Sequence, residues 1–187
     1  MRTIFPFDEI NTFKERLHLH FSEGRIKSEE DVEDIIDEIL DLCLLAYANG
    51  VRYIAEEFNI EVGLEPTADE LERVIYQEID GETWEQRVRH WYEEGGTEAD
   101  IVRIAETESH RVGNTAADEA AIQAGATTKT WVTMRDDRVR ETHEYLEQTT
   151  VPIDSRFYTF DGDSARFPGD FTLAENNCGC RCQLRYS

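Results

Sequence analysis

The sequence predicts an α+β fold, with a mainly helical N-terminal half followed by a small mixed α/β C-terminal module with short strands. Apolar residues recur at helical spacing as far as about residue 124. Beyond that point, prolines, glycines and aromatic residues surround short β-type runs. The 187 residues are 40% hydrophobic, which is enough for a sizeable core. We expect two regions, a helical one at residues 1–100 and the C-terminal module at residues 101–187.

Capping residues divide the N-terminal half into helices. Ser28 is a good N-cap, and the three acidic residues after it favour the positive end of a helix. The last helix ends in a run of small residues, GNTAADEAAIQAGA, which lets a neighbouring element approach closely. The expected helices are a short one within residues 1–27, one from Ser28 to about Phe58, one from Thr67 to about Ile79, one carrying Trp84, Val88 and Trp91, and one from Thr97 to about Ala124.

The elements expected in the C-terminal module are short. The segment KTWVT at residues 129–133 has the β-branched and aromatic content of a strand. Asp136 or Asp137 is expected to cap a helix of about ten residues at 138–147. One face of that helix would carry Val139, His143 and Leu146. Further strands are expected within RFYTF and QLRYS, with turns at Asp161–Gly162 and Pro168–Gly169.

The chain is a strong polyanion. Its 41 Asp and Glu against 19 Lys and Arg give a net charge of −22, and only three of the basic residues are Lys. Such a surface would not wrap a nucleic-acid backbone, because phosphate binding needs clustered Lys and Arg. Dense carboxylates with few lysines favour a halophilic host, since molar salt screens charge repulsion to about 3 Å. An acidic protein from an ordinary cytoplasm is the alternative.

Most of this charge belongs to the helical half. Residues 1–112 carry 29 acidic and 11 basic residues, a net charge of −18, whereas residues 113–187 carry 12 and 8, a net charge of −4. No run of 18 or more apolar residues occurs, which excludes a membrane-spanning helix. Residues 1–10 lack a basic stretch followed by an apolar one, so we expect no secretory signal.

Three cysteines near the C-terminus form the sharpest chemical feature. Cys178, Cys180 and Cys182 alternate in NNCGCRC, and in an extended strand their thiols would lie about 7 Å apart on one face. Tetrahedral zinc needs sulfur atoms roughly 3.8 Å apart, so the segment would have to bend, which Gly179 permits. With His143 as fourth ligand, the four residues would form a closed, structural zinc site. A disulfide formed in oxidising surroundings and reduced, structural thiols are the alternatives.

The remaining reactive residues indicate structure rather than catalysis. Asp136 and Asp137 could form an acid–base pair, but a helix cap beside two arginines explains them. The sequence holds no phosphate-binding glycine loop, GxSxG elbow or HExxH helix. We therefore assign no catalytic and no cofactor-binding residue and expect no enzyme. Cys43 is expected in the core, and His90 and His110 on the surface or in packing. The group Trp84, Trp91 and Tyr92 is expected in core packing, with a partner surface as the alternative.

A series of motifs follows one order along the C-terminal half. The last long helix carries Thr107, Glu108, Arg111 and Asn114, and KTWVT, DDRVRETH, VPIDSRF, FPGD and CRCQLRY follow it. In this order the motifs resemble the phage head morphogenesis family, the Mu F-like minor head proteins of tailed viruses. The resemblance covers roughly residues 101–187. Cys178 precedes the usual cysteine pair, and residues 147–149 replace a glycine that is common in the family.

The resemblance implies a minor capsid component inside the head near the portal, acting in head assembly, DNA packaging or genome ejection. Residues 1–100 would be the portal- or scaffold-docking region, and the partners would be the portal protein and the major capsid or scaffold protein, with no membrane. Combined with the acidity, this indicates a tailed virus of a halophilic archaeon, assembled in the host cytoplasm. The alternative is a metal-dependent hydrolase or effector enzyme delivered with the virion, because similar domains occur fused to toxins.

The arginines of the C-terminal module leave a question about DNA open. Arg135, Arg138, Arg140, Arg181 and Arg185 either contact packaged DNA or neutralise neighbouring carboxylates. Neutralisation is favoured, since Arg140 and Glu144 are spaced as an i, i+4 ion pair and molar salt would abolish phosphate contacts.

Overall fold

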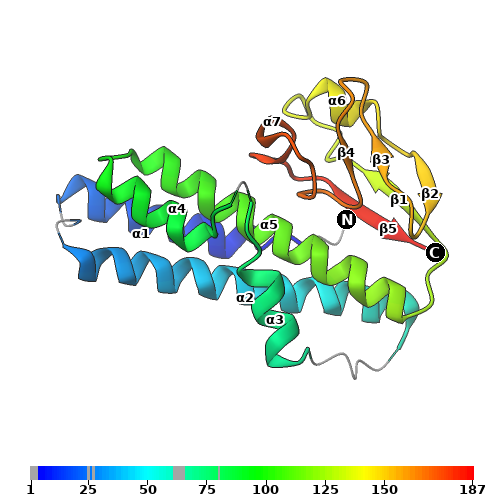
Figure 1. Cartoon of the computed structure of the whole chain (residues 1–187), viewed down its shortest axis with the longest axis horizontal. Helices are drawn as coiled ribbons and strands as arrows, with labels where there is room; N and C mark the ends of the chain where they lie inside the picture. Colours follow the sequence, from blue (N-terminus) through cyan, green and yellow to red (C-terminus); the bar gives the residue numbers. More distant parts are fainter. Residues whose placement is uncertain (1–3, 25, 27, 61–65, 80) are drawn as a thin grey trace.

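The chain folds into a bundle of long helices with a small sheet-containing module at one end (Figure 1). The computed structural model describes residues 4–24, 26, 28–60, 66–79 and 81–187. The fold is α+β, as the sequence predicts. In this described part of the chain, no helix is both long and apolar enough to cross a membrane. The helices of the N-terminal half are α1 (Phe7–Ser22), α2 (Glu29–Phe58), α3 (Ala68–Ile75), α4 (Trp84–Glu93) and α5 (Glu98–Gln123).

Capping side chains set where these helices begin. The Ser28 hydroxyl accepts a hydrogen bond from the backbone N–H of Asp31, and the Asp31 carboxylate accepts one from the Ser28 N–H at 2.8 Å. Such boxes satisfy N–H groups that have no partner within the helix. The predicted helix starts after Ser28, Thr67 and Thr97 are confirmed. The helix after Thr67 ends at Ile75, short of the predicted end, because Ile79 instead pairs with Glu82 in an isolated β-bridge.

The most extensive packing in the molecule is between α2 and α5. Gly50 of α2 and Gly113 of α5 lie against each other in this contact. A Cβ atom on Gly50 would lie 2.2 Å from the carbonyl oxygen of Gly113, and one on Gly113 would lie 2.6 Å from Cγ2 of Ile4. The small residues at the end of α5 therefore permit the close approach that the sequence predicts.

Two clusters of buried side chains make up the core. The first fills the helical bundle and includes Cys43, Trp84 and Trp91, with Tyr92 partly buried against it, which confirms their predicted place. The second lies within the C-terminal module and takes in Ile4 and Ile54 from the helical half. The module is thus packed onto the bundle through shared apolar contacts. The boundary predicted between residues 100 and 101 falls inside α5 and stays a prediction.

The module is built around three antiparallel strands in the order β2-β1-β5, beside a separate β3–β4 hairpin. Trp131 of β1 lies opposite Leu184 of β5, and both side chains are fully buried. The strands predicted within 129–133, 156–160 and 183–187 are confirmed, and Gly162 and Gly169 have positive φ angles at the predicted turns. The module's elements are β1 (Thr128–Val132), α6 (Glu141–Glu144), β2 (Thr150–Pro152), β3 (Phe157–Tyr158), β4 (Ser164–Ala165), α7 (Ala174–Asn177) and β5 (Gln183–Tyr186).

The ten-residue helix predicted at 138–147 is wrong. Only α6 is helical, and Arg140 occupies its N-cap position. The carboxylate of Asp136 does not cap a helix, because it accepts hydrogen bonds from the backbone N–H of Arg138 and from the guanidinium of Arg181. The tertiary contact with Arg181 therefore replaces the local capping interaction. His143 and Leu146 are nevertheless buried together, as the predicted helix face required.

A buried ion pair ties the sheet to α5. Nζ of Lys129 on β1 lies 3.3 Å from Oδ1 of Asp118, and the hydroxyl of Tyr186 donates to the same oxygen at 3.3 Å. Burial lowers the pKa of Lys129 and raises the pKa of Asp118, because each charge has lost its hydration. Both side chains are almost fully buried, so water cannot replace either partner. Separating β1 from α5 would therefore leave a buried charge without its counter-charge.

Candidate metal centre

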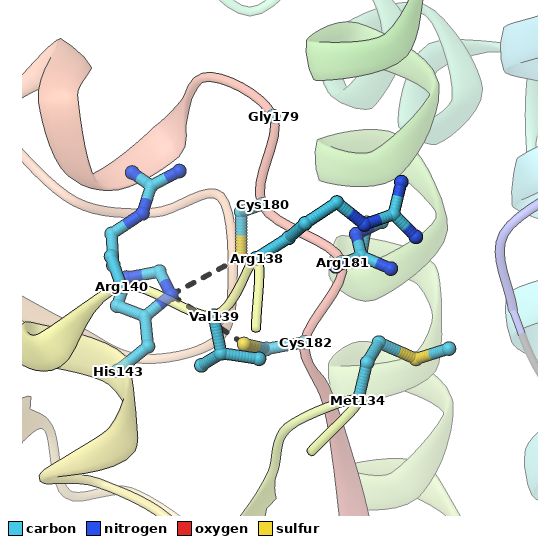
Figure 2. Close-up of a pocket in the computed structure, with 9 residues that line it drawn as sticks. All are labelled: Met134, Arg138, Val139, Arg140, His143, Gly179, Cys180, Arg181 and Cys182. Atoms are coloured by element: carbon cyan, nitrogen blue, oxygen red, sulfur yellow. Dashed lines mark hydrogen bonds between the residues drawn. The ribbon is translucent and has the colours of Figure 1, made fainter. Parts of the chain in front are cut away.

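Three of the four predicted zinc ligands meet in the C-terminal module (Figure 2). Nδ1 of His143 lies 3.6 Å from Sγ of Cys180 and 3.5 Å from Sγ of Cys182. The three potential ligand atoms are within 4.8 Å of one another. All three side chains are buried, and both cysteines are free thiols. The fold therefore brings together side chains that are 37 and 39 residues apart in the sequence.

Cys178 lies outside this group of potential ligands. Its side chain is partly exposed, and its backbone carbonyl accepts a hydrogen bond of 2.6 Å from Nη2 of Arg140. The next residue, Gly179, has a φ of 66°, which supplies the expected bend between the cysteines. The role of Cys178 as a fourth ligand stays a prediction.

Aromatic rings hold His143 in place. Its ring stacks on Phe171, with centroids 5.2 Å apart, and meets the edge of Trp131, with centroids 5.5 Å apart. Nε2 of His143 is buried and has no hydrogen-bond partner among the described residues. Packing, rather than a hydrogen bond to the far nitrogen, therefore fixes the orientation of the ring and directs Nδ1 at the two thiols.

The cysteines are held by α5 as well as by β5. Nε2 of His110 lies 2.7 Å from the backbone carbonyl oxygen of Cys182. Because a carbonyl can only accept, this ring nitrogen carries the proton and donates it. Cys182 directly precedes β5, so the hydrogen bond aligns the start of that strand with α5.

The surroundings of the two thiols favour ionisation of Cys180 and oppose ionisation of Cys182. Burial opposes ionisation of Cys180, but hydrogen bonding from Cys182 and the nearby His110 and His143 rings bring the pKa of Cys180 well below its usual value. The hydrogen bond to Cys180, together with burial, raises the pKa of Cys182. The lowered pKa of Cys180 favours its thiolate, which is the form of cysteine that binds metal ions.

Arginines on two loops surround the thiols. Asp136 forms a bidentate ion pair with Arg181, with N–O distances of 2.9 and 2.7 Å, and Glu147 pairs with Arg135 at 2.7 Å. These pairs fit the predicted neutralisation of carboxylates. Arg140 differs from the prediction, because it donates to the carbonyl of Cys178 instead of pairing with Glu144.

The Asp136–Arg181 pair makes a pH-dependent contribution to stability. The hydrogen bonds from Arg181 bring the pKa of Asp136 from an ordinary 3.8 down to about 2. A folded-state pKa below the unfolded one means that the pair stabilises the fold fully above about pH 4 and loses that contribution as the pH falls toward 2. We expect an NMR titration of the Asp136 carboxyl carbon to show a midpoint near 2 in the native protein.

The matched variant for this titration is Arg181→Gln, which removes the two charged donors. Its Asp136 carboxyl should titrate closer to 3.8. A wild-type midpoint already at 3.8 would contradict the assigned role of the ion pair.

The structure gives His110 and Asp136 contacts that the sequence did not predict. His110 was expected on the surface or in packing, and its 4% exposure agrees with packing. Its hydrogen bond to the carbonyl of Cys182 was not predicted, and no local pattern indicates it, because the two residues are 72 positions apart. Asp136 was expected as a local helix cap and instead pairs with Arg181.

The α5 motif has a structural role. Glu108 is fully buried and accepts hydrogen bonds from Nη2 of Arg87 at 2.6 Å and from Nε of Arg111 at 2.9 Å. Arg111 also donates to the backbone carbonyls of Val74 and Ile75, the last residues of α3. The motif therefore ties α3 and α4 to α5, because cations satisfy the free carbonyls at a helix C-terminus.

The sequence pattern of the phage Mu protein F-like proteins matches residues 67–185, more than half of the chain. The chain therefore belongs to this family, as the resemblance implied. Minor head protein GP7 of Bacillus phage SPP1 is 34% identical over 85 residues, which make up 44% of this chain and 28% of that protein. The chain thus covers less than a third of the length of this relative. No solved structure matches the chain.

Proposed function

We propose that the protein is a minor head protein of a tailed virus, located inside the capsid near the portal and acting in head assembly, DNA packaging or genome ejection. The family match over residues 67–185 carries this proposal, because it covers α3 to α5 together with nearly the whole C-terminal module. The similarity to a minor head protein supports it. The protein would assemble in the host cytoplasm and reach the virion by binding other capsid components.

The helical region is the proposed docking part for the portal or scaffold. At the end of the bundle remote from the C-terminal module (Figure 1), a hollow of about 200 Å³ is lined by α1, α4 and adjoining residues. Phe21, Trp91 and Tyr92 give this hollow an aromatic wall. Aromatic side chains are enriched where proteins bind one another, so this hollow is the favoured contact site.

Mass spectrometry of purified virions tests the proposal. We expect the protein at a copy number close to that of the portal protein, with cross-links from α1 or α4 to the portal. Tyr92→Ala should reduce incorporation without changing the helical circular dichroism spectrum, whereas Tyr158→Ala, which removes an exposed ring from β3, serves as a matched control. Absence of the protein from virions would contradict the proposal.

A hydrolase or effector enzyme is the alternative function. A three-ligand Cys-His set does resemble the open sites of catalytic metals. The small cavity beside the three side chains, however, is lined by no carboxylate among the described residues, and Glu106, which lines the larger neighbouring cleft, pairs with Lys14. Neither observation favours a carboxylate general base at the metal position. We propose a non-enzymatic protein; a hydrolase activity that is lost in a folded His143→Ala variant would favour the alternative instead.

Adaptation to high salt is proposed from the surface charge. The outer face of α2 exposes Asp34, Asp37 and Asp41 on neighbouring turns, and a net charge of −22 repels itself in dilute buffer. We expect the free energy of unfolding to rise from dilute buffer to molar potassium chloride, because screening shortens the range of that repulsion to about 3 Å. Urea unfolding at both salt concentrations measures this. Equal stability in the two would favour an ordinary cytoplasm.

A further inference from the structure

We infer that the centre binds one zinc ion through three protein ligands, His143, Cys180 and Cys182, and keeps a fourth position for a water molecule or a small anion. Zinc would replace the thiol protons, which are released to solvent. The inference does not depend on the proposed role in the virion, because it rests on the geometry of these side chains alone.

The distances from Nδ1 of His143 to the two sulfur atoms fit tetrahedral zinc, and the sulfur atoms lie within 4.8 Å of each other. Bonds of about 2.3 Å to sulfur and about 2.0–2.1 Å to nitrogen place the two ligand atoms roughly 3.6 Å apart at the tetrahedral angle. Nδ1 of His143 lies 3.6 and 3.5 Å from the sulfur atoms of Cys180 and Cys182. A ring nitrogen has either one proton or one lone pair, yet Nδ1 faces both sulfur atoms at nearly equal distances, as two ligands of one shared metal ion would require.

A cavity beside the three ligands limits the size of the fourth. Its volume of about 10 Å³ is at the lower limit for one water molecule. The cavity wall includes the three ligand residues themselves, whereas Cys178 does not contribute to it. A site of three protein ligands with one open position differs from the closed, four-ligand site predicted from the sequence.

The surroundings of the open position favour a negatively charged ligand. Arg138, Arg140 and Arg181 line the same cavity. Asp136 pairs with both Arg138 and Arg181, so its single negative charge leaves an excess of positive charge among the three arginines. A zinc ion with two thiolates and a neutral imidazole carries no net charge, so this excess would add attraction for a small anion. A larger cleft of about 380 Å³ is lined by residues of α1 and by the Gly179–Arg181 segment, so Cys180 borders both this cleft and the small cavity.

Metal analysis of purified protein is the first test. After incubation with excess zinc and gel filtration, we expect one zinc ion per chain in the wild type and in Cys178→Ser. Cys180→Ser and Cys182→Ser should lose stoichiometric binding, and circular dichroism checks that their helices remain. Wild-type protein that retains no zinc, or that carries a Cys180–Cys182 disulfide as purified under reducing conditions, would overturn the metal site.

Cobalt(II) substitution tests the open position without any ligand variant. The visible spectrum should show tetrahedral cobalt with thiolate charge-transfer bands of equal intensity in the wild type and in Cys178→Ser. Fluoride, which is no larger than a water molecule, should change the spectrum of both proteins, because it displaces water at the fourth position. Loss of a charge-transfer contribution in Cys178→Ser would instead identify Cys178 as the fourth ligand, and a spectrum indifferent to fluoride would show a closed site. Either result would overturn the three-ligand assignment.

Discussion

Glu108→Ala is expected to cause the largest loss of stability of any single substitution in α5. Glu108 is fully buried between Arg87 and Arg111, and Arg111 is only 2% exposed. Removing the carboxylate leaves a buried guanidinium without its counter-charge, which costs about 3–5 kcal/mol. The thermal unfolding midpoint should fall by about 6–20 °C for a chain of this length. Differential scanning calorimetry at constant salt measures the change.

The matched control is Glu119→Ala, on the same helix. Glu119 pairs with Arg73 at 2.7 Å, but both side chains remain in contact with solvent, with exposures of 31% for Glu119 and 59% for Arg73. An exposed ion pair contributes about 0–1 kcal/mol. Glu108→Gln, which keeps the shape but not the charge, should lie between the two. Equal midpoints for Glu108→Ala and Glu119→Ala would show that the buried cluster does not stabilise the fold.

Gly50→Ala is expected to destabilise the protein although alanine is the better helix former. The new Cβ atom would lie 2.2 Å from the carbonyl oxygen of Gly113 and 3.1 Å from Cβ of Ala116. Backbone atoms cannot rotate away as a side chain can, so α2 and α5 would have to separate. We expect a loss of about 3 kcal/mol, at the upper end for overpacked cores, measured by urea unfolding.

The intrinsic helix preference can be measured separately at Ala48, an exposed position two residues earlier in α2. Ala48→Gly should cost about 1 kcal/mol from helix propensity alone. The same difference in helix propensity would stabilise Gly50→Ala by a similar amount if there were space for the new Cβ atom between α2 and α5. A stabilised Gly50→Ala protein would therefore show that the two helices can move apart at no cost.

Much of the helical half was predictable because its signals are local. Ser28 and Thr67 begin helices through hydrogen bonds to residues three positions later, and an apolar stripe continues α2 through Gly50. The sequence could not show why Gly50 interrupts that stripe. The reason is the contact with Gly113, which is 63 residues away and exists only in the folded chain.

The residues of the candidate metal site could be predicted from the sequence, but their arrangement in space could be predicted only in part. The alternating cysteines and His143 were identified from residue type and spacing, and the fold brings three of the four together. The position of Cys178 outside the group of ligands could not be predicted from the sequence, because it depends on the bend at Gly179 and on the hydrogen bond from Arg140. Similarly, the contact between Asp136 and Arg181 joins segments 45 residues apart and overrides the local capping preference.

The sequence by itself determined the α+β class, the limits of the long helices, the excess of acidic charge in the helical half and the family to which the chain belongs. These properties follow from periodicity, capping and motif order, all of which act over a few residues or depend on residue order alone. Tertiary structure decided that α6 is a single turn, that Glu108 and Arg111 form a buried cluster, and that His143 faces Cys180 and Cys182. Each of these outcomes depends on contacts between side chains that are far apart in the sequence and are buried together only in the folded chain. Local sequence patterns do not indicate which of these side chains meet.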